Sequence, residues 1–262
     1  MQMNGKYSIF GALLSIMALA LVPCVECADD DTLFQVSTID ALLQGVYDGF
    51  YTFDDLKTHG DLGIGTFDSL DGEMIALDGD YYQIKADGVA YPVQGNMTSP
   101  FSTVTYFQAD QTIAIQNASN FTQLSQQLDE HLPSRNVFYV MRIDGTFPYV
   151  KTRSVPKQEK PYPRLADAVK NQSVFELYNA TGSVVGIWAP DFAKGLNVVG
   201  YHLHFITEDR KAGGHILDLQ VDDAKALVDI TPGFDMQLPT TGDFYNVDLT
   251  QDLQSELEKI EK

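Results

Sequence analysis

Three Asp-Gly pairs punctuate residues 58–93 and constrain the fold more than any other feature of the chain. They are Asp71-Gly72, Asp78-Gly79 and Asp87-Gly88, and they follow one another at intervals of seven and nine residues. Asp-Gly favours tight turns between antiparallel strands, and the stretches between these pairs alternate apolar and polar residues. The segment therefore predicts a β-meander, in which each strand pairs with the next.

Two short helices are predicted around this β-rich segment. Residues 39–47 have helical spacing behind a capping Ser37 or Thr38, and residues 121–132 have it behind a capping Asn120. Both stretches are short, so the chain is expected to be mainly strands with a few helices.

The second half of the chain is also predicted to consist mainly of strands. Asp144-Gly145 predicts a second hairpin, residues 173–190 a pair of strands and residues 200–230 a longer series. A proline-bearing crossing that begins at Pro156 is the best candidate boundary. We therefore expect a mixed α/β (α+β) fold of two β-sheet-rich domains, residues 28–155 and residues 156–262, with a metal site on a β-hairpin of the second.

The first 27 residues are typical of an export signal. A short polar region with Lys6 precedes an apolar run, and small and acidic residues follow it. An uncleaved membrane anchor is the alternative, although the run is slightly short for a full span. Cys24 and Cys27 both lie in this segment, so a mature chain cut after Cys27 would have neither disulfides nor a catalytic thiol. The protein is therefore expected to be exported, either secreted or extracytoplasmic, with anchoring to the membrane through this segment as the alternative.

The chain is strongly acidic, with a formal net charge of −19. Such a surface keeps a protein soluble and repels nucleic acid and anionic membranes. It also repels an anionic substrate. A site for a carboxylate would therefore need its own positive charge, from a metal ion or an arginine.

Three of the five histidines lie in "GYHLHFITEDRKAGGHILDL", residues 200–219. In a strand, His202 and His204 point to the same face. If the chain reverses between Asp209 and Arg210, His215 lies opposite His204, within about 5 Å across the strands. Three nitrogens could then bind zinc at about 2.0–2.1 Å and leave coordination positions open, as a catalytic zinc requires. The alternative is a solvated hairpin that happens to carry three histidines.

Two other residues could contribute to such a site. Glu73 follows a tight turn directly, and Arg153 ends an apolar strand just before Pro156. Taken alone, each is as readily explained as a solvated surface charge. The final "ELEKIEK" has the pattern of a solvated helix end, and its spacing does not single out Glu261.

Four motifs, "GDLGIGTFDSLDGEMI", "TRSVPKQEKPYP", "GYHLHFITEDRKAGGHILDL" and "FDMQLP", occur in this order. Together they resemble the α-acetolactate decarboxylase family, from about Phe34 to the C-terminus. The resemblance implies a two-domain α/β protein, usually a homodimer, with a zinc ion and no organic cofactor. It also implies conversion of the small 2-hydroxy-3-oxo acid (S)-2-acetolactate to (R)-acetoin and carbon dioxide.

The resemblance also implies roles for individual residues. It assigns zinc binding to His202, His204 and His215, catalysis to Glu73, Arg153 and Glu261, and substrate binding to Thr66 and Arg153. The tail is the least matched part of the chain, so Glu256 or Glu258 could take the place of Glu261. The same carboxylates could either ligate zinc or deliver a proton.

Two other functions fit parts of the pattern. "HLHFITE" followed by Gly213 approximates the metal motif of a cupin-type enzyme, with Glu208 as a ligand, but no second histidine motif follows. An exported, non-catalytic metal- or carbohydrate-binding module would explain the hairpin and the acidic surface. It would leave Glu73 and Arg153 unexplained.

Overall fold

The computed structural model describes residues 1–2 and 31–261. The predicted export signal, residues 1–27, lies almost entirely outside the described residues. Within them, no helix is long and apolar enough to cross a membrane.

Two β-sheets and a small two-stranded ribbon make up most of the described chain. The seven-stranded sheet has the order β14-β1-β8-β3-β4-β5-β6. Its strands are β1 (Thr32–Val36), β3 (Leu62–Thr66), β4 (Glu73–Leu77), β5 (Asp80–Ile84), β6 (Ala90–Pro92), β8 (Ser102–Thr105) and β14 (Gly233–Gln237). The ribbon pairs β2 (Tyr51–Thr52) with β7 (Thr98–Ser99).

The five-stranded sheet has the order β10-β11-β12-β13-β9. Its strands are β9 (Gln111–Ala118), β10 (Phe138–Ser154), β11 (Ser173–Ala189), β12 (Gly200–Thr207) and β13 (Gly213–Thr231). An additional pairing of β10 with β13 closes four of these strands on themselves, like a small barrel.

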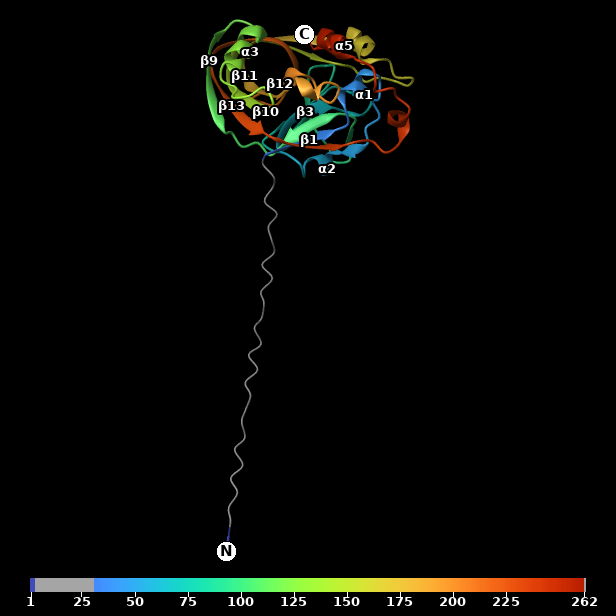
Figure 1. Cartoon of the computed structure of the whole chain (residues 1–262). Helices are drawn as coiled ribbons and strands as arrows, with labels where there is room; N and C mark the ends of the chain where they lie inside the picture. Colours follow the sequence, from blue (N-terminus) through green and yellow to red (C-terminus); the bar gives the residue numbers. More distant parts are fainter. Residues whose placement is uncertain (3–30, 262) are drawn as a thin grey trace.

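The helices are short. They are α1 (Ile39–Leu43), α2 (Phe53–Leu56), α3 (Phe121–Asp129), α4 (Leu165–Ala168) and α5 (Gln254–Ile260), with 3-10 turns at Asp68–Leu70, Val169–Asn171, Asp191–Ala193 and Gly242–Tyr245. Figure 1 shows α3 beside the strands of the five-stranded sheet, and α1 and α5 near each other on the other side of the molecule.

The predicted fold class and the predicted meander are confirmed. Strands β3, β4, β5 and β6 pair in sequence, each antiparallel to the next. Thr38 caps α1 by accepting a hydrogen bond from the backbone N–H of Ala41, and Asn120 caps α3 through the N–H of Gln123. These features are set by residues near one another in the chain, which is why a single sequence predicts them.

The hairpin predicted at Asp144-Gly145 is wrong. Strand β10 runs straight through this pair, with Asp144 opposite Ser183 and Gly145 opposite Gly182 of β11. The carboxylate of Asp144 accepts a hydrogen bond from Ser183 Oγ and another from Arg142 Nε, both at 2.6 Å. The first contact crosses from β11 and the second lies within β10, and together they stabilise an extended chain where the dipeptide alone would favour a turn. In the same way, the predicted pair of strands in residues 173–190 is a single strand, β11 (Ser173–Ala189).

The division of the chain into two domains between residues 155 and 156 stays a prediction. Strands from both sides of it share each sheet. Strands β9 and β10 lie with β11, β12 and β13, and β14 returns to the seven-stranded sheet beside β1. One apolar cluster also joins the sheets, with Leu62 and Ile75 from one and Val140 and Ile206 from the other. This shared core brings β4 against β12, where the candidate site lies.

Candidate active site

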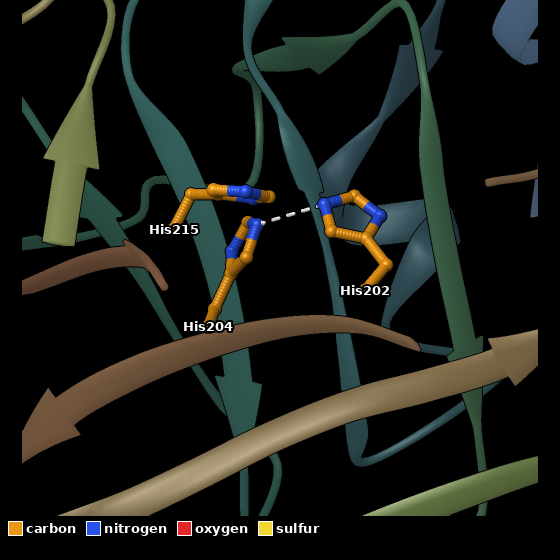
Figure 2. A group of neighbouring side chains, drawn as sticks. All are labelled: His202, His204 and His215. Carbon is orange, nitrogen blue, oxygen red and sulfur yellow. Dashed lines mark hydrogen bonds between the residues drawn. The ribbon is translucent and has the colours of Figure 1, made fainter. Parts of the chain in front are cut away.

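The β12–β13 hairpin brings the three predicted histidines together. His204 lies directly opposite His215, and the pairs that follow place the reversal between Asp209 and Arg210, as predicted. His202 lies two residues before His204, on the same face of β12. Figure 2 shows the three rings turned toward one another. Among the described residues, these three form the group that could hold a metal ion, since their ligand atoms all lie within 4.8 Å of one another.

Hydrogen bonds orient the rings. Nδ1 of His204 donates to the backbone carbonyl of Met74 in β4 at 2.9 Å, which leaves its Nε2 free to face the other rings. That Nε2 lies 3.2 Å from Nε2 of His202. His215 has no hydrogen-bond partner at either ring nitrogen, although both atoms are buried. Buried polar atoms rarely remain unsatisfied, so this site calls for a ligand between the rings.

All three imidazoles are neutral at ordinary pH. Burial, together with the smaller effect of the nearby charge of Arg153, lowers the pKa of His202 to about 3. Burial also holds the pKa of His204 and of His215 well below the usual value, with Arg153 and the neighbouring histidines adding to it. A neutral imidazole offers a lone pair to a cation. The site is therefore ready to bind a metal without first losing protons.

Glu73 enters the site from the first position of β4. Its Oε2 lies 3.8 Å from Nε2 of His204. Gly72 before it has φ +89, and a Cβ there would lie 2.2 Å from the carbonyl oxygen of Ile84, so the turn requires glycine. Burial raises the pKa of Glu73 to about 7, against the opposing effect of Arg153. The side chain is buried, not solvated.

Thr66 ends β3 opposite Glu73. Its hydroxyl donates to the carbonyl oxygen of Gly72 at 2.7 Å, and the residue is buried in the wall of the site. The threonine thus fixes the turn that carries Glu73, and it also lines the cavity.

Arg153 lies at the end of β10, opposite His215. Its Nη1 donates to Gln172 Oε1 and its Nη2 to Glu261 Oε1, both at 3.1 Å. Its Nε is buried and has no partner. Arg153 is 4% exposed, so it is not the surface charge that its sequence context also permitted. Gln172 was not identified from the sequence, and no local pattern marks it.

The C-terminal segment was wrongly predicted as a solvated helix end. Helix α5 docks through the buried side chains of Leu257 and Ile260, which pack in a cluster with residues of α1 and α4. Glu261 follows as the C-cap residue, with Oε2 3.5 Å from His215 Nε2 and 3.8 Å from His202 Nε2. Burial raises its pKa, and Arg153 opposes that shift.

The two alternative glutamates lie elsewhere. Glu256 forms an ion pair with Arg164, with Oε2 3.0 Å from Nη2. Glu258 is exposed and accepts a hydrogen bond from Gln254 within α5. Among the three candidates in the tail, Glu261 is therefore the one at the histidines.

The ligand set of a cupin-type enzyme is not formed. Glu208 is exposed, follows the end of β12, and is absent from the histidine group. The geometry thus contradicts this alternative.

The site encloses a cavity of about 40 Å³ with two unlike walls. One wall is polar and consists of Thr66, Glu73, Arg153, His202, His215 and Glu261. The other is apolar and was not predicted as a set. It consists of Ile39, Leu42, Leu70, Phe101, Val155 and Leu165. These residues come from distant segments, so no sequence spacing indicates that they share a surface.

Known proteins resemble the chain along most of its length. The family model described as alpha-acetolactate decarboxylase matches residues 33–251. The alpha-acetolactate decarboxylase of Methanosarcina mazei is 60% identical over 242 residues, which cover 92% of this chain and 84% of the relative. That of Bacillus licheniformis is 43% identical over 232 residues, covering 88% and 92%.

A solved structure agrees with these matches. The crystal structure of alpha-acetolactate decarboxylase from Bacillus subtilis strain 168 superposes with a TM-score of 0.85 at 41% identity, over 88% of this chain and 98% of that one. The sequence matches, the similar fold and the histidine site all support membership of the same family. The chain belongs to the alpha-acetolactate decarboxylase family of enzymes.

Proposed function

We propose that the protein is a zinc-dependent enzyme that converts (S)-2-acetolactate to (R)-acetoin and carbon dioxide. The observation that carries this proposal is the meeting of three neutral, buried histidines with one arginine and two carboxyl groups around a single cavity. The arginine supplies the positive charge that an acidic protein needs to hold an anionic substrate.

The residues fit a zinc ion. His202, His204 and His215 offer three nitrogen ligands, and the unpartnered Oε2 of Glu261 lies beside two of them. Nitrogen and carboxylate oxygen are ligands that zinc takes in catalytic sites. When bound, zinc would supply Lewis acidity that stabilises negative charge developing on the substrate's ketone and hydroxyl oxygens.

We assign binding of the substrate carboxylate to Arg153. Arg153 lines the cavity and its buried Nε has no partner, while Gln172 and Glu261 hold the other two nitrogens of the guanidinium. A planar, fixed donor set orients a carboxylate better than a flexible ammonium does. Arg153 therefore positions the bond that breaks.

The reaction breaks the bond between C2 and the carboxylate. Carbon dioxide leaves, and the electron pair moves onto the ketone oxygen to give an enediolate. One proton added to carbon then yields acetoin, so the balance is acetolactate and a proton to acetoin and carbon dioxide. A carboxylic acid on one side of the cavity would deliver this proton to a single face.

Glu73 is the better placed proton donor. Glu261 is held by the guanidinium of Arg153, which favours its ionised form. Glu73 has no ion pair with an arginine or lysine among the described contacts, and burial raises its pKa to about 7. We therefore assign proton delivery to Glu73. Glu261 would instead act as a metal ligand or orient Arg153.

One assay tests the whole proposal. Purified protein is incubated with racemic acetolactate, and acetoin is measured by chiral gas chromatography with and without a chelator. We expect (R)-acetoin, loss of activity after chelation, and recovery when zinc is restored. Acetoin formation at only the spontaneous rate, or chelator-resistant turnover by metal-free protein, would refute the proposal.

We also propose that the protein is exported and forms a homodimer. The pattern of residues 1–27 supports export, and the family resemblance supports the dimer. Mass spectrometry of the mature N-terminus and light scattering of the purified protein test the two points separately. An intact N-terminus in the cytoplasm would contradict export, and a monomer mass would contradict the dimer.

A further inference from the structure

Leu70 stands out in the apolar wall because its backbone is strained. We propose that Leu70 limits the size of the alkyl group on the substrate, so that the protein prefers 2-hydroxy-3-oxo acids with methyl at C2 over those with ethyl. This inference rests on the proposed decarboxylase function and names the specificity of the same site.

The strain lies in two consecutive residues. Ser69 has φ +61 and Leu70 has φ +54, a left-handed conformation that residues other than glycine seldom adopt. Neither residue is the Asn or Asp that tolerates this region better. A strained backbone conformation persists only where contacts with the surrounding structure hold it in place, and such conformations are concentrated at functional sites.

Two distant segments hold this turn in place. The backbone N–H of Ser69 donates to the carbonyl oxygen of Tyr47, and its own carbonyl accepts from the N–H of Gln158, both at 2.8 Å. Its hydroxyl lies 2.9 Å from the hydroxyl of Tyr162. The chain is thereby fixed immediately before Leu70, and the leucine side chain is directed into the wall of the metal cavity, where it is 4% exposed.

The two walls determine how a substrate must lie. Its carboxylate, hydroxyl and ketone oxygens need the side of the cavity that holds Arg153 and the histidines, so its alkyl groups face the apolar side. The cavity is small, about 40 Å³, so the alkyl groups of a substrate pack closely against the apolar wall. An added methylene then meets the side chains of that wall, and Leu70 is the one whose backbone is least free to move away.

The test compares two substrates in the zinc-loaded enzyme. They are acetolactate and its homologue 2-ethyl-2-hydroxy-3-oxobutanoate. In Leu70→Ala we expect the ratio of kcat/KM for the ethyl substrate to that for the methyl substrate to rise about tenfold, the usual effect of one methylene in a fitted pocket. Leu70→Gly, which suits the left-handed backbone, should raise it as well even if the alanine variant folds poorly.

Leu43→Ala is the matched control. Leu43 is a fully buried leucine of the same apolar cluster but does not line the cavity. We expect it to lower stability and leave the substrate ratio unchanged. An unchanged ratio in both Leu70 variants, or an equal rise in Leu43→Ala, would overturn the inference. Absence of acetoin from the wild-type protein would instead refute the proposed function.

Discussion

The guanidinium of Arg153 holds the carboxylate of Glu261 at 3.1 Å, although 108 positions separate the two residues in the chain. Both side chains are largely shielded from water, and Glu261 also faces His202 and His215. This pair joins the end of β10 to the C-cap of α5. The last residues of the chain thus complete a site whose metal ligands lie on β12 and β13.

Replacing Arg153 with lysine tests the geometry of this pair. An ammonium cannot contact Gln172, Glu261 and a substrate carboxylate together, so Arg153→Lys should lower kcat/KM about 100-fold, as expected when a positioning group is lost. Zinc content, measured by elemental analysis, should be kept because the histidines are intact. Arg142→Lys, which changes an arginine with surface ion pairs on the same strand, is the control and should stay near the wild-type rate. Equal activity in both variants would show that Arg153 has no special role.

The three glutamates of the tail give a second comparison. Glu261→Gln should lose activity about 100-fold because it removes a charge that faces the metal ligands. Glu258→Gln should have no measurable effect, since that side chain is exposed. Glu256→Gln should lower thermal stability slightly by breaking the partly exposed pair with Arg164, without changing kcat. Steady-state kinetics of the three variants test this placement of the tail. A loss of activity confined to Glu258→Gln would contradict it.

His204 is the histidine whose loss should be most damaging. It is fully buried and is oriented by the carbonyl of Met74, so His204→Ala should abolish both zinc binding and turnover. His131→Ala is the control, because His131 is exposed and lies outside the group. Elemental analysis and the acetoin assay are run on the same samples. Turnover near the wild-type rate in a zinc-free His204→Ala protein would refute a metal mechanism.

The sequence predicted the features that depend on short separations. Side chains alternate between the two faces of a strand, and the chain was expected to reverse between Asp209 and Arg210. These two features, both within one hairpin, predict the pairing of His204 with His215. The caps at Thr38 and Asn120 are equally local. The resemblance to a family then supplied Glu73 and Arg153, whose spacing had left them indistinguishable from surface charges.

Features that depend on tertiary contacts were not predictable in this way. The continuity of β10 through Asp144-Gly145 comes from its pairing with β11. The docking of α5 depends on apolar contacts with α1 and α4, which are distant in the sequence. The partner of Arg153 at Gln172 and the apolar wall around Leu70 likewise bring together residues that no periodic pattern connects.

A last prediction concerns stability away from the site. Burial raises the pKa of Asp229 to about 6, against the effect of the Gln108 N–H that donates to it. The folded protein therefore binds this proton more tightly than the unfolded chain, so the contribution of Asp229 to the free energy of unfolding falls as pH rises from about 4 through 6. Asp229→Asn cannot ionise and lacks this loss. Relative to the variant, the wild-type protein should lose about 1–2 kcal/mol of stability between pH 4 and pH 7, after allowance for screening by nearby water. Urea unfolding of both proteins at several pH values measures this difference, and a difference that stays constant with pH would show that the pKa of Asp229 is not raised.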